Sequence, residues 1–208
     1  DYYDLFQLGE HHLGMIVADV SGKGIPGALV MTMTRAVMHY EAPRTLSPKQ
    51  AFVAANKRIA ADIKRGMFVT AFYLVLDTNR QEARVASAGH NPMLVHRART
   101  GVVESINPNG IALGFDAGPI FDRTIHEDSV RLEVGDALVL YTDGVVEAMN
   151  PAKEEFGDDR LIQIIRKSAD ASAAELTRRI RAAVIAHQGE GEQHDDITLI
   201  TARIKEAP

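Results

Sequence analysis

The sequence has no cysteine among its 208 residues. This absence excludes disulfide bonds, zinc sites built from thiolates and a phosphatase mechanism with a cysteine nucleophile. It fits a reducing compartment, and we expect a cytoplasmic protein. No apolar stretch approaches the length of a membrane span, and no signal peptide is visible. We therefore expect no membrane contact by this domain itself.

Several other signals are missing or scarce. Only 6% of the residues are aromatic, and the net charge is -5. A nucleic-acid surface is therefore disfavoured, and we interpret Arg178, Arg179 and Arg181 as the solvated face of a helix. The sequence has no His-Glu-x-x-His zinc motif and no Gly-x-Ser-x-Gly elbow. A phosphate-binding P-loop around Lys23 is rejected because the required Gly and Ser or Thr positions hold Val17 and Gly24.

The remaining composition is that of an ordinary globular protein, with 46% apolar and 25% charged residues. We expect residues 1–208 to form a single domain. The chain opens on Asp1 without an initiating methionine. We therefore expect it to be the catalytic part of a longer protein with an upstream regulatory or sensor domain.

Apolar periodicity and turn signals predict an α+β fold. Leu13–Val20 reads as a buried strand, and Val69–Leu76 with Glu82–Ala88 as a hairpin. Capping boxes predict helices that begin at Ser47 and Ser172. Other helices are expected at Gly27–Tyr40, with Leu29, Met33, Ala36, Val37 and Tyr40 facing the core, and at Arg160–Ser168. Further strands are expected at Met93–His96, Val102–Ile106, Ile120–Ile125, Ala137–Tyr141 and Ile197–Ile204.

Four acidic residues in strand-end or loop-like settings carry the functional signal: Asp1, Asp19, Asp143 and Asp195. Taken singly, each has an ordinary explanation as a turn residue or a solvated charge. The lone His90 is likewise more typical of a structural histidine. Taken together, the carboxylates form the oxygen-ligand set that Mg²⁺ or Mn²⁺ prefers. They indicate metal-assisted hydrolysis.

A series of short motifs occurs in order along nearly the whole chain. They are Asp1-Tyr2-Tyr3-Asp4, Asp19-Val20-Ser21-Gly22-Lys23-Gly24, Ala88-Gly89-His90-Asn91-Pro92, Tyr141-Thr142-Asp143-Gly144 with Glu147-Ala148, Phe156-Gly157, and Asp195-Asp196-Ile197-Thr198. As a set, they resemble the SpoIIE-type branch of the metal-dependent serine/threonine protein phosphatases (PPM, type 2C-like). The resemblance implies an αββα four-layer sandwich with two central antiparallel β-sheets flanked by helices.

The resemblance also implies a site for two Mn²⁺ or Mg²⁺ ions. Asp1 would lie in the first metal-site motif, and Asp19 would bridge both ions beside the backbone carbonyl of Val20. Asp143 and Asp195 would complete the ligand set, with the neighbouring Asp196 as a less direct candidate. Asp19 and Asp143 are the expected catalytic residues, and the ions would activate a water for attack on phosphorus.

Substrate and control follow from the resemblance alone. The expected substrate is a phosphorylated anti-sigma-factor antagonist of the STAS fold in a bacterial partner-switching pathway. The two helices after Asp19 are expected to form a movable switch. The sequence leaves open whether the protein forms a homodimer. Where eukaryotic relatives carry Gly-His, this chain has Val20 and Ser21, so the leaving-group proton must come from another source. Two alternatives are a catalytically silent binding module and a hydrolase of another phosphate ester.

Overall fold

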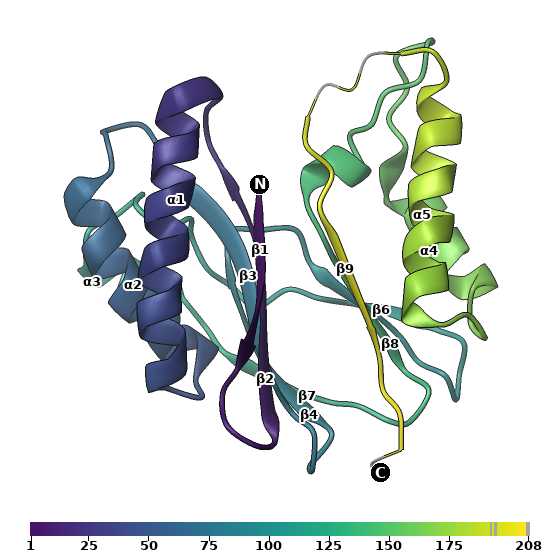
Figure 1. Cartoon of the computed structure of the whole chain (residues 1–208), viewed down its shortest axis with the longest axis horizontal. Helices are drawn as coiled ribbons and strands as arrows, with labels where there is room; N and C mark the ends of the chain where they lie inside the picture. The colour runs from purple at the N-terminus through teal and green to yellow at the C-terminus, as the bar shows by residue number, and fades with distance from the viewer. Residues whose placement is uncertain (192, 194, 207–208) are drawn as a thin grey trace. The chain divides into compact units, whose positions relative to one another are not determined.

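The computed structural model describes residues 1–191, 193 and 195–206. The chain divides into two compact units (Figure 1). Unit 1 comprises Asp1–Asn91 and Asn107–Leu132, and unit 2 comprises Pro92–Ile106 and Glu133–Glu206. Each unit contains one antiparallel sheet and its own helices. The predicted α+β class with two antiparallel sheets and helices is confirmed.

The sheet of unit 1 has the strand order β1-β2-β3-β4-β7. The strands are β1 Tyr2–Gln7, β2 His12–Val20, β3 Val69–Asp77, β4 Glu82–Ala88 and β7 Asp128–Arg131. The predicted strand at Leu13–Val20 is confirmed as β2, and the predicted hairpin is confirmed as β3 and β4. Residues on both faces of β2 and β3 are buried, which explains why these strands read as apolar runs and not as alternating patterns.

One face of this sheet is covered by the helices α1 Gly24–Glu41, α2 Pro48–Asp62 and α3 Pro119–Thr124 (Figure 1), with the short 3₁₀ helix η1 Ala42–Arg44 between the first two. The hydroxyl of Ser47 accepts a hydrogen bond from the backbone N–H of Gln50, so the predicted cap of α2 is confirmed. Phe52, Ala55 and Ile59 are fully buried beneath α2, as expected.

The predicted apolar face of α1 is confirmed only for Met33 and Val37, which are partly buried against the core. Leu29 and Tyr40 are 66% and 53% exposed, whereas Val30, Thr34 and Met38 form the buried row. Apolar residues recur around the whole circumference of this helix, and two overlapping rows with helical spacing compete for the core. Periodicity alone could not choose between them.

The predicted strand at Ile120–Ile125 is also wrong, because the segment forms α3. One carboxylate oxygen of Asp116 accepts hydrogen bonds from the backbone N–H groups of Gly118, Ile120 and Phe121. This cap starts the helix, and Phe121 and Ile125, four residues apart, are both fully buried.

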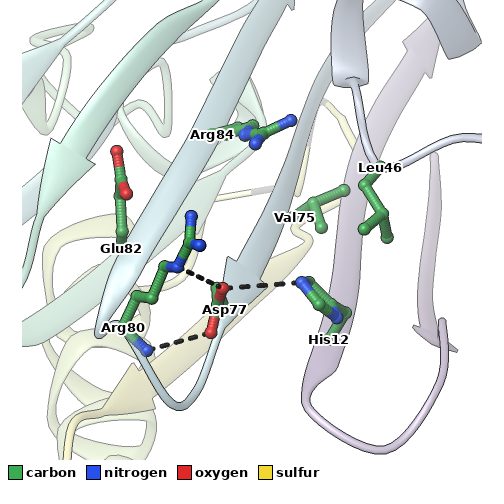
Figure 2. Close-up of a pocket in the computed structure, with 7 residues that line it drawn as sticks. All are labelled: His12, Leu46, Val75, Asp77, Arg80, Glu82 and Arg84. Atoms are coloured by element: carbon green, nitrogen blue, oxygen red, sulfur yellow. Dashed lines mark hydrogen bonds and ion pairs between the residues drawn. The ribbon is translucent and has the colours of Figure 1, made fainter.

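The end of the unit 1 sheet where β2 begins and β3 ends is closed by local polar contacts (Figure 2). Asp77 accepts hydrogen bonds from the backbone N–H groups of Arg80 and Asn79, which lower the pKa of its carboxyl. Its other oxygen lies 3.5 Å from Nε2 of His12. These contacts fix the β3–β4 turn, and Asp19 lies at the opposite end of β2.

The sheet of unit 2 has the strand order β6-β5-β8-β9. The strands are β5 Met93–His96, β6 Val103–Ile106, β8 Ala137–Tyr141 and β9 Leu199–Arg203, and the helices are α4 Gly157–Lys167, α5 Ala173–Gln188 and the 3₁₀ turn η2 Asp143–Val145. Both helices pack on one face of the sheet. Ser172 caps α5 through the N–H of Glu175, and Leu176, Ile180 and Val184 are buried, as predicted.

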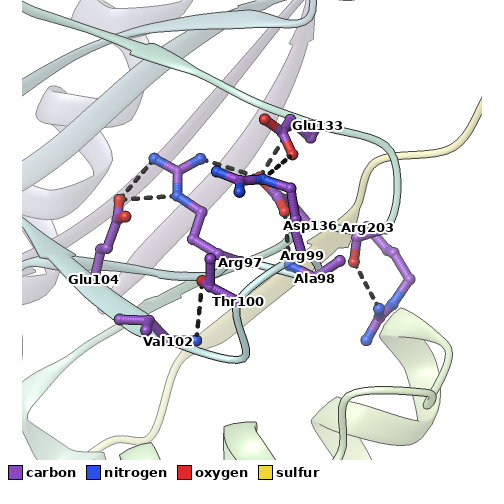
Figure 3. Close-up of polar contacts among 10 residues, drawn as sticks. Arg97, Ala98, Arg99, Thr100, Val102, Glu104, Glu133, Asp136 and Arg203 are labelled. Atoms are coloured by element: carbon purple, nitrogen blue, oxygen red, sulfur yellow. Dashed lines mark hydrogen bonds and ion pairs between the residues drawn. The ribbon is translucent and has the colours of Figure 1, made fainter.

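A buried carboxylate fixes the start of β8 (Figure 3). Asp136 is 1% exposed and accepts hydrogen bonds from the guanidinium of Arg97 and the backbone N–H groups of Ala98 and Glu133. Arg97 also binds Glu104 of β6. Because the buried charge has several donors, it holds β5, β6 and β8 in register.

Within the described residues, no helix combines the length and the apolar character that crossing a lipid bilayer requires.

Candidate functional site

The first pair of predicted ligands lies at one end of the unit 1 sheet. Tyr2 of β1 pairs with Ala18 of β2, and the same antiparallel register continued by one residue puts Asp1 opposite Asp19. Asp1, Asp19 and the following Val20 are all partly exposed. Two carboxylates and a backbone carbonyl are therefore available from neighbouring strands at one sheet edge.

The loop after β2 is held by a serine. The backbone N–H and the hydroxyl of Ser21 both donate to the carbonyl of Phe68, at 2.9 and 3.0 Å, and the N–H of Phe68 donates back to the hydroxyl at 2.7 Å. Gly22 and Gly24 have positive φ angles of 117° and 74°, a conformation that favours glycine. The hydroxyl of Ser21 is therefore engaged in fixing the loop.

The second pair lies in unit 2, where β8 ends at the 3₁₀ turn η2. The backbone N–H of Thr142 donates to the carbonyl of Thr198 at 3.1 Å, and the N–H of Thr198 donates to the hydroxyl of Thr142 at 3.0 Å. The next residue in the turn, Asp143, accepts from the N–H groups of Val146 and Glu147 through its carbonyl. The segment that leads into β9 is thus bound directly beside Asp143.

Gly144 brings the two segments still closer. A Cβ atom on this residue would lie 2.0 Å from the carbonyl oxygen of Asp196 and 3.6 Å from the carbonyl carbon of Asp195. No side chain fits in that space. The Asp-Gly pair is therefore required for close backbone approach, and Asp143 and Asp195 come from segments in contact.

The donor chemistry fits hard divalent cations. The candidates are carboxylate and carbonyl oxygens, and the sequence offers no thiolate. The four aspartates divide as two in each unit. Across the part of the chain that the structure describes, no three His, Cys, Asp or Glu side chains are grouped closely enough to hold a metal ion. Each unit thus contributes a pair, and the pairing into one site stays a prediction.

Comparison with known proteins gives the family. A family model described as Stage II sporulation protein E (SpoIIE) matches residues 9–205. The chain belongs to this family.

The chain is 30% identical over 205 residues to the phosphoserine phosphatase RsbU of Bacillus subtilis strain 168, covering 99% of this chain and 59% of RsbU. It is 28% identical over 227 residues to Protein IcfG of Synechocystis sp., covering 96% of this chain and 35% of IcfG. The chain therefore spans roughly a third to three fifths of these relatives' lengths.

Solved structures establish the PP2C fold of this SpoIIE domain. The PP2C phosphatase domain of SpoIIE from Bacillus subtilis superposes with a TM-score of 0.81 at 19% identity, covering 98% of this chain and 58% of that one. RsbX in complex with magnesium gives a TM-score of 0.70 at 14% identity, with 98% and 86% coverage. The catalytic domain of PstP in complex with two manganese ions gives 0.69 at 15%, with 98% and 91% coverage. Proteins of this fold thus bind magnesium or manganese.

In this SpoIIE domain, Glu147 belongs to the acidic surroundings of the second pair. The pKa of its carboxyl is raised, first by partial desolvation and then by the negative charges of Asp143, Glu155 and Asp195. From the sequence alone, Glu147 is part of a motif without a predicted role of its own. A cation bound by Asp143 and Asp195 would offset the part of this shift that comes from their negative charges.

The histidine of the Ala-Gly-His-Asn-Pro motif lies near the first pair. Asp19 pairs with Thr70 of β3, and the hydroxyl of Thr70 lies 2.9 Å from Nδ1 of His90. His90 is 6% exposed, and its backbone N–H donates to the hydroxyl of Ser87. The side chain therefore packs one strand away from Asp19 and supports the start of β3. Only strand pairing reveals this neighbourhood, because residues 19, 70 and 90 are far apart in sequence.

Proposed function

We propose that this chain is the catalytic domain of a metal-dependent protein phosphatase that hydrolyses phosphoserine or phosphothreonine. The observation that carries the proposal is the pairing of the aspartates. Strand register puts Asp1 beside Asp19, and the close approach at Gly144 puts the Asp195 segment beside Asp143. Membership of the SpoIIE family supports joining the two pairs into one centre.

Two Mn²⁺ or Mg²⁺ ions would be held by Asp1, Asp19 and the carbonyl of Val20 on one side and by Asp143 and Asp195 on the other. When bound, such ions polarise phosphoryl oxygens and lower the pKa of water. The protein's part is to keep its carboxylates in position before the substrate arrives. Asp19 is held by its place in β2, and Asp143 by the turn that closes on its own carbonyl.

The substrate class is proposed from the relatives. RsbU and RsbP of Bacillus subtilis are both named phosphoserine phosphatases, and this chain matches part of each. We propose a phosphorylated anti-sigma-factor antagonist of the STAS type as substrate, in the cytoplasm, where such a regulator of transcription would act. An upstream regulatory or sensor domain belongs to the same proposal.

The test measures hydrolysis of a phosphoserine peptide and of p-nitrophenyl phosphate with Mn²⁺, with Mg²⁺ and with excess chelator. We expect activity with either ion and none in chelator. Asp19→Asn and Asp143→Asn should each lower kcat/KM by about a thousandfold on both substrates, because each removes a charged ligand.

Asp170→Asn is the matched control. Asp170 is exposed in the turn after α4, so the same chemical change should leave both activities at the wild-type value. Full activity of the Asp19 or Asp143 variant, or of the wild type in chelator, would contradict the proposed function. Hydrolysis of a nucleotide in preference to the phosphopeptide would support the alternative phosphate-ester hydrolase.

A further inference from the structure

An apolar groove in unit 1 lies beside the loop that follows Asp19. It has a volume of about 410 Å³ and lies between the end of α2, the turn after it and the loop before α3. Ala60, Ile63, Met67, Phe68, Phe115 and Ala117 supply most of its surface. All these residues belong to unit 1.

The loop that forms one wall of the groove is held rigidly. The fully buried side chain of Asn56 donates to the carbonyl of Asp116 and accepts from the N–H of Gly114, both at 2.8 Å. Gly114 has a φ of 81°, and a Cβ there would meet the Ile63 side chain at 3.0 Å. The Asp116 carboxylate in turn caps α3. The wall therefore exists before any ligand binds.

This rigid loop displays an aromatic side chain to solvent. Phe115 is 71% exposed, whereas Phe121, only six residues later, is fully buried. An exposed aromatic residue that is fixed by its backbone and adjoins an apolar groove is typical of a protein-binding hot spot. Its backbone is already ordered, so covering it would cost little further loss of freedom.

The groove is continuous with the strand end that carries the first ligand pair. Val20 pairs with Val69, which exchanges two backbone hydrogen bonds with Leu113 at 2.8 and 2.9 Å. Phe68 lines the groove and is bonded to Ser21, two residues after Asp19. Phe68 thus joins a wall of the groove to the loop that follows Asp19.

Charge at the groove suits a phosphorylated ligand. Among the described residues that line it, Arg65 carries a positive charge and none is acidic. The exposed Lys64 precedes it in the same turn, although the chain as a whole has a net charge of -5. The acidic Asp62 and Asp116 also lie next to lining residues, so we assign the attraction for a phosphate to the guanidinium of Arg65 alone.

We propose that this groove docks the phosphoprotein substrate by receiving an apolar side chain close in sequence to the phosphorylated residue, with Arg65 facing the substrate's negative charge. This proposal rests on the proposed function and deepens it. It assigns part of substrate selection to Phe115 and Arg65, which lie outside the predicted metal ligands.

The test uses a set of phosphoserine peptides in which a single leucine is moved through the four positions on either side of the phosphoserine, the others being serine or alanine. The wild type should favour leucine at one or two adjacent positions by about tenfold in kcat/KM, mainly through KM, because one well-buried anchor is worth roughly that factor. Hydrolysis of p-nitrophenyl phosphate, which cannot fill the groove, serves as the reference.

Phe115→Ala should flatten the leucine preference and lower the ratio of peptide to aryl phosphate kcat/KM by about tenfold. Arg65→Glu should lower the same ratio, because it places a negative charge on the rim. Ile185→Ala removes an exposed apolar side chain on α5 of unit 2, and Arg181→Ala removes an exposed arginine there. Both controls should keep the wild-type ratio.

A wild type without a leucine preference, or groove variants with an unchanged ratio, would overturn the docking groove while leaving the phosphatase proposal intact. An equal loss on both substrates would also overturn it, because that result indicates a general effect on the catalytic centre. Absence of both wild-type activities in the presence of Mn²⁺ would instead count against the proposed function.

Discussion

The ends of the two units that carry the candidate ligands are fixed by different means. In unit 2, Gly144 touches the backbone of Asp196, and Thr142 is hydrogen bonded twice to Thr198. In unit 1, the chain after Asp19 passes through Gly22 and enters α1 at Gly24, and both glycines have positive φ angles. The unit 2 pair is thus set by close backbone packing, whereas the loop beside the unit 1 pair is tied to Phe68 through the side chain of Ser21.

The helix that follows the unit 1 loop shows the same contrast. α1 exposes Ile25 and Leu29 by 77% and 66%, whereas α5 of unit 2 buries a regular apolar row. Polar contacts also hold α1: His39 binds Asp4 of β1, and Glu41 binds Arg58 of α2, each at 2.5 Å. The expected role of α1 as part of a movable switch stays a prediction.

The strongest test of this difference between the two units adds one methyl group to a glycine in each, at Gly144 in unit 2 and at Gly27 in unit 1. In Gly144→Ala, the new Cβ would lie 2.0 Å from a backbone oxygen of Asp196, and in Gly27→Ala it would lie 2.5 Å from the backbone oxygen of Gly22. We expect Gly144→Ala to lower kcat/KM on p-nitrophenyl phosphate by about a hundredfold, because the Asp195 segment must move relative to Asp143. Gly27→Ala should have a smaller effect, since its new Cβ would overlap less with the backbone, at 2.5 Å against 2.0 Å.

Two further measurements make this prediction specific. Thermal unfolding will show whether either variant loses its fold. Calorimetric titration will measure the affinity for Mn²⁺, which depends on the predicted ligand pairs. Equal losses of activity in the two variants, or a larger loss for Gly27→Ala, would show that the two ends are constrained alike and would remove the basis of the comparison.

The candidate site could be predicted only in part from the sequence. Asp19 and Asp143 follow strands whose apolar runs are plain, so their strand-end positions could be anticipated. The contact between Gly144 and Asp196 could not, because it joins residues 52 positions apart (196 − 144) through a backbone approach that leaves no local pattern. Pairing of Thr70 with Asp19 and its contact with His90 are hidden for the same reason.

The fold shows where local patterns suffice. α2 and α5 were predictable because Ser47 and Ser172 mark their first turns, and each helix has a single apolar row. The segment at Ile120 was not, since its helical state depends on capping by Asp116 from outside the helix. Sequence patterns therefore specified elements with one dominant signal and failed where the deciding contact lay outside the element.

The contact between α1 and β1 predicts a pH-dependent stability of unit 1. Burial opposes ionisation of Asp4, but hydrogen bonds from His39, the N–H of Leu5 and Tyr2 outweigh it and lower the pKa of the carboxyl. A lowered pKa gives stability above the unfolded-state value of about 4, and this stability is lost as pH falls through the folded-state pKa. In Asp4→Asn, the free energy of unfolding should fall less than in the wild type between about pH 5 and pH 3.

Urea unfolding at a series of pH values measures this difference. The exposed Asp170 supplies the control: Asp170→Asn should follow the wild-type pH dependence. If Asp4→Asn shows the same acid loss of stability as the wild type, the carboxylate does not anchor α1 to β1, and other contacts must hold the helix.

The smallest expected effects come from the two capping serines, one in each unit. The hydroxyl of Ser172 accepts from the N–H of Glu175, so Ser172→Ala should cost about 1 kcal/mol of unfolding free energy. The hydroxyl of Ser47 accepts from the N–H of Gln50 and also donates to Glu127 at 2.5 Å. Ser47→Ala should therefore cost more, about 2 kcal/mol, because the carboxylate of Glu127 also loses a partner.

Urea unfolding of both variants measures the two losses of unfolding free energy. If Ser172→Ala costs as much as Ser47→Ala or more, the link from α2 to Glu127 adds nothing to the cap.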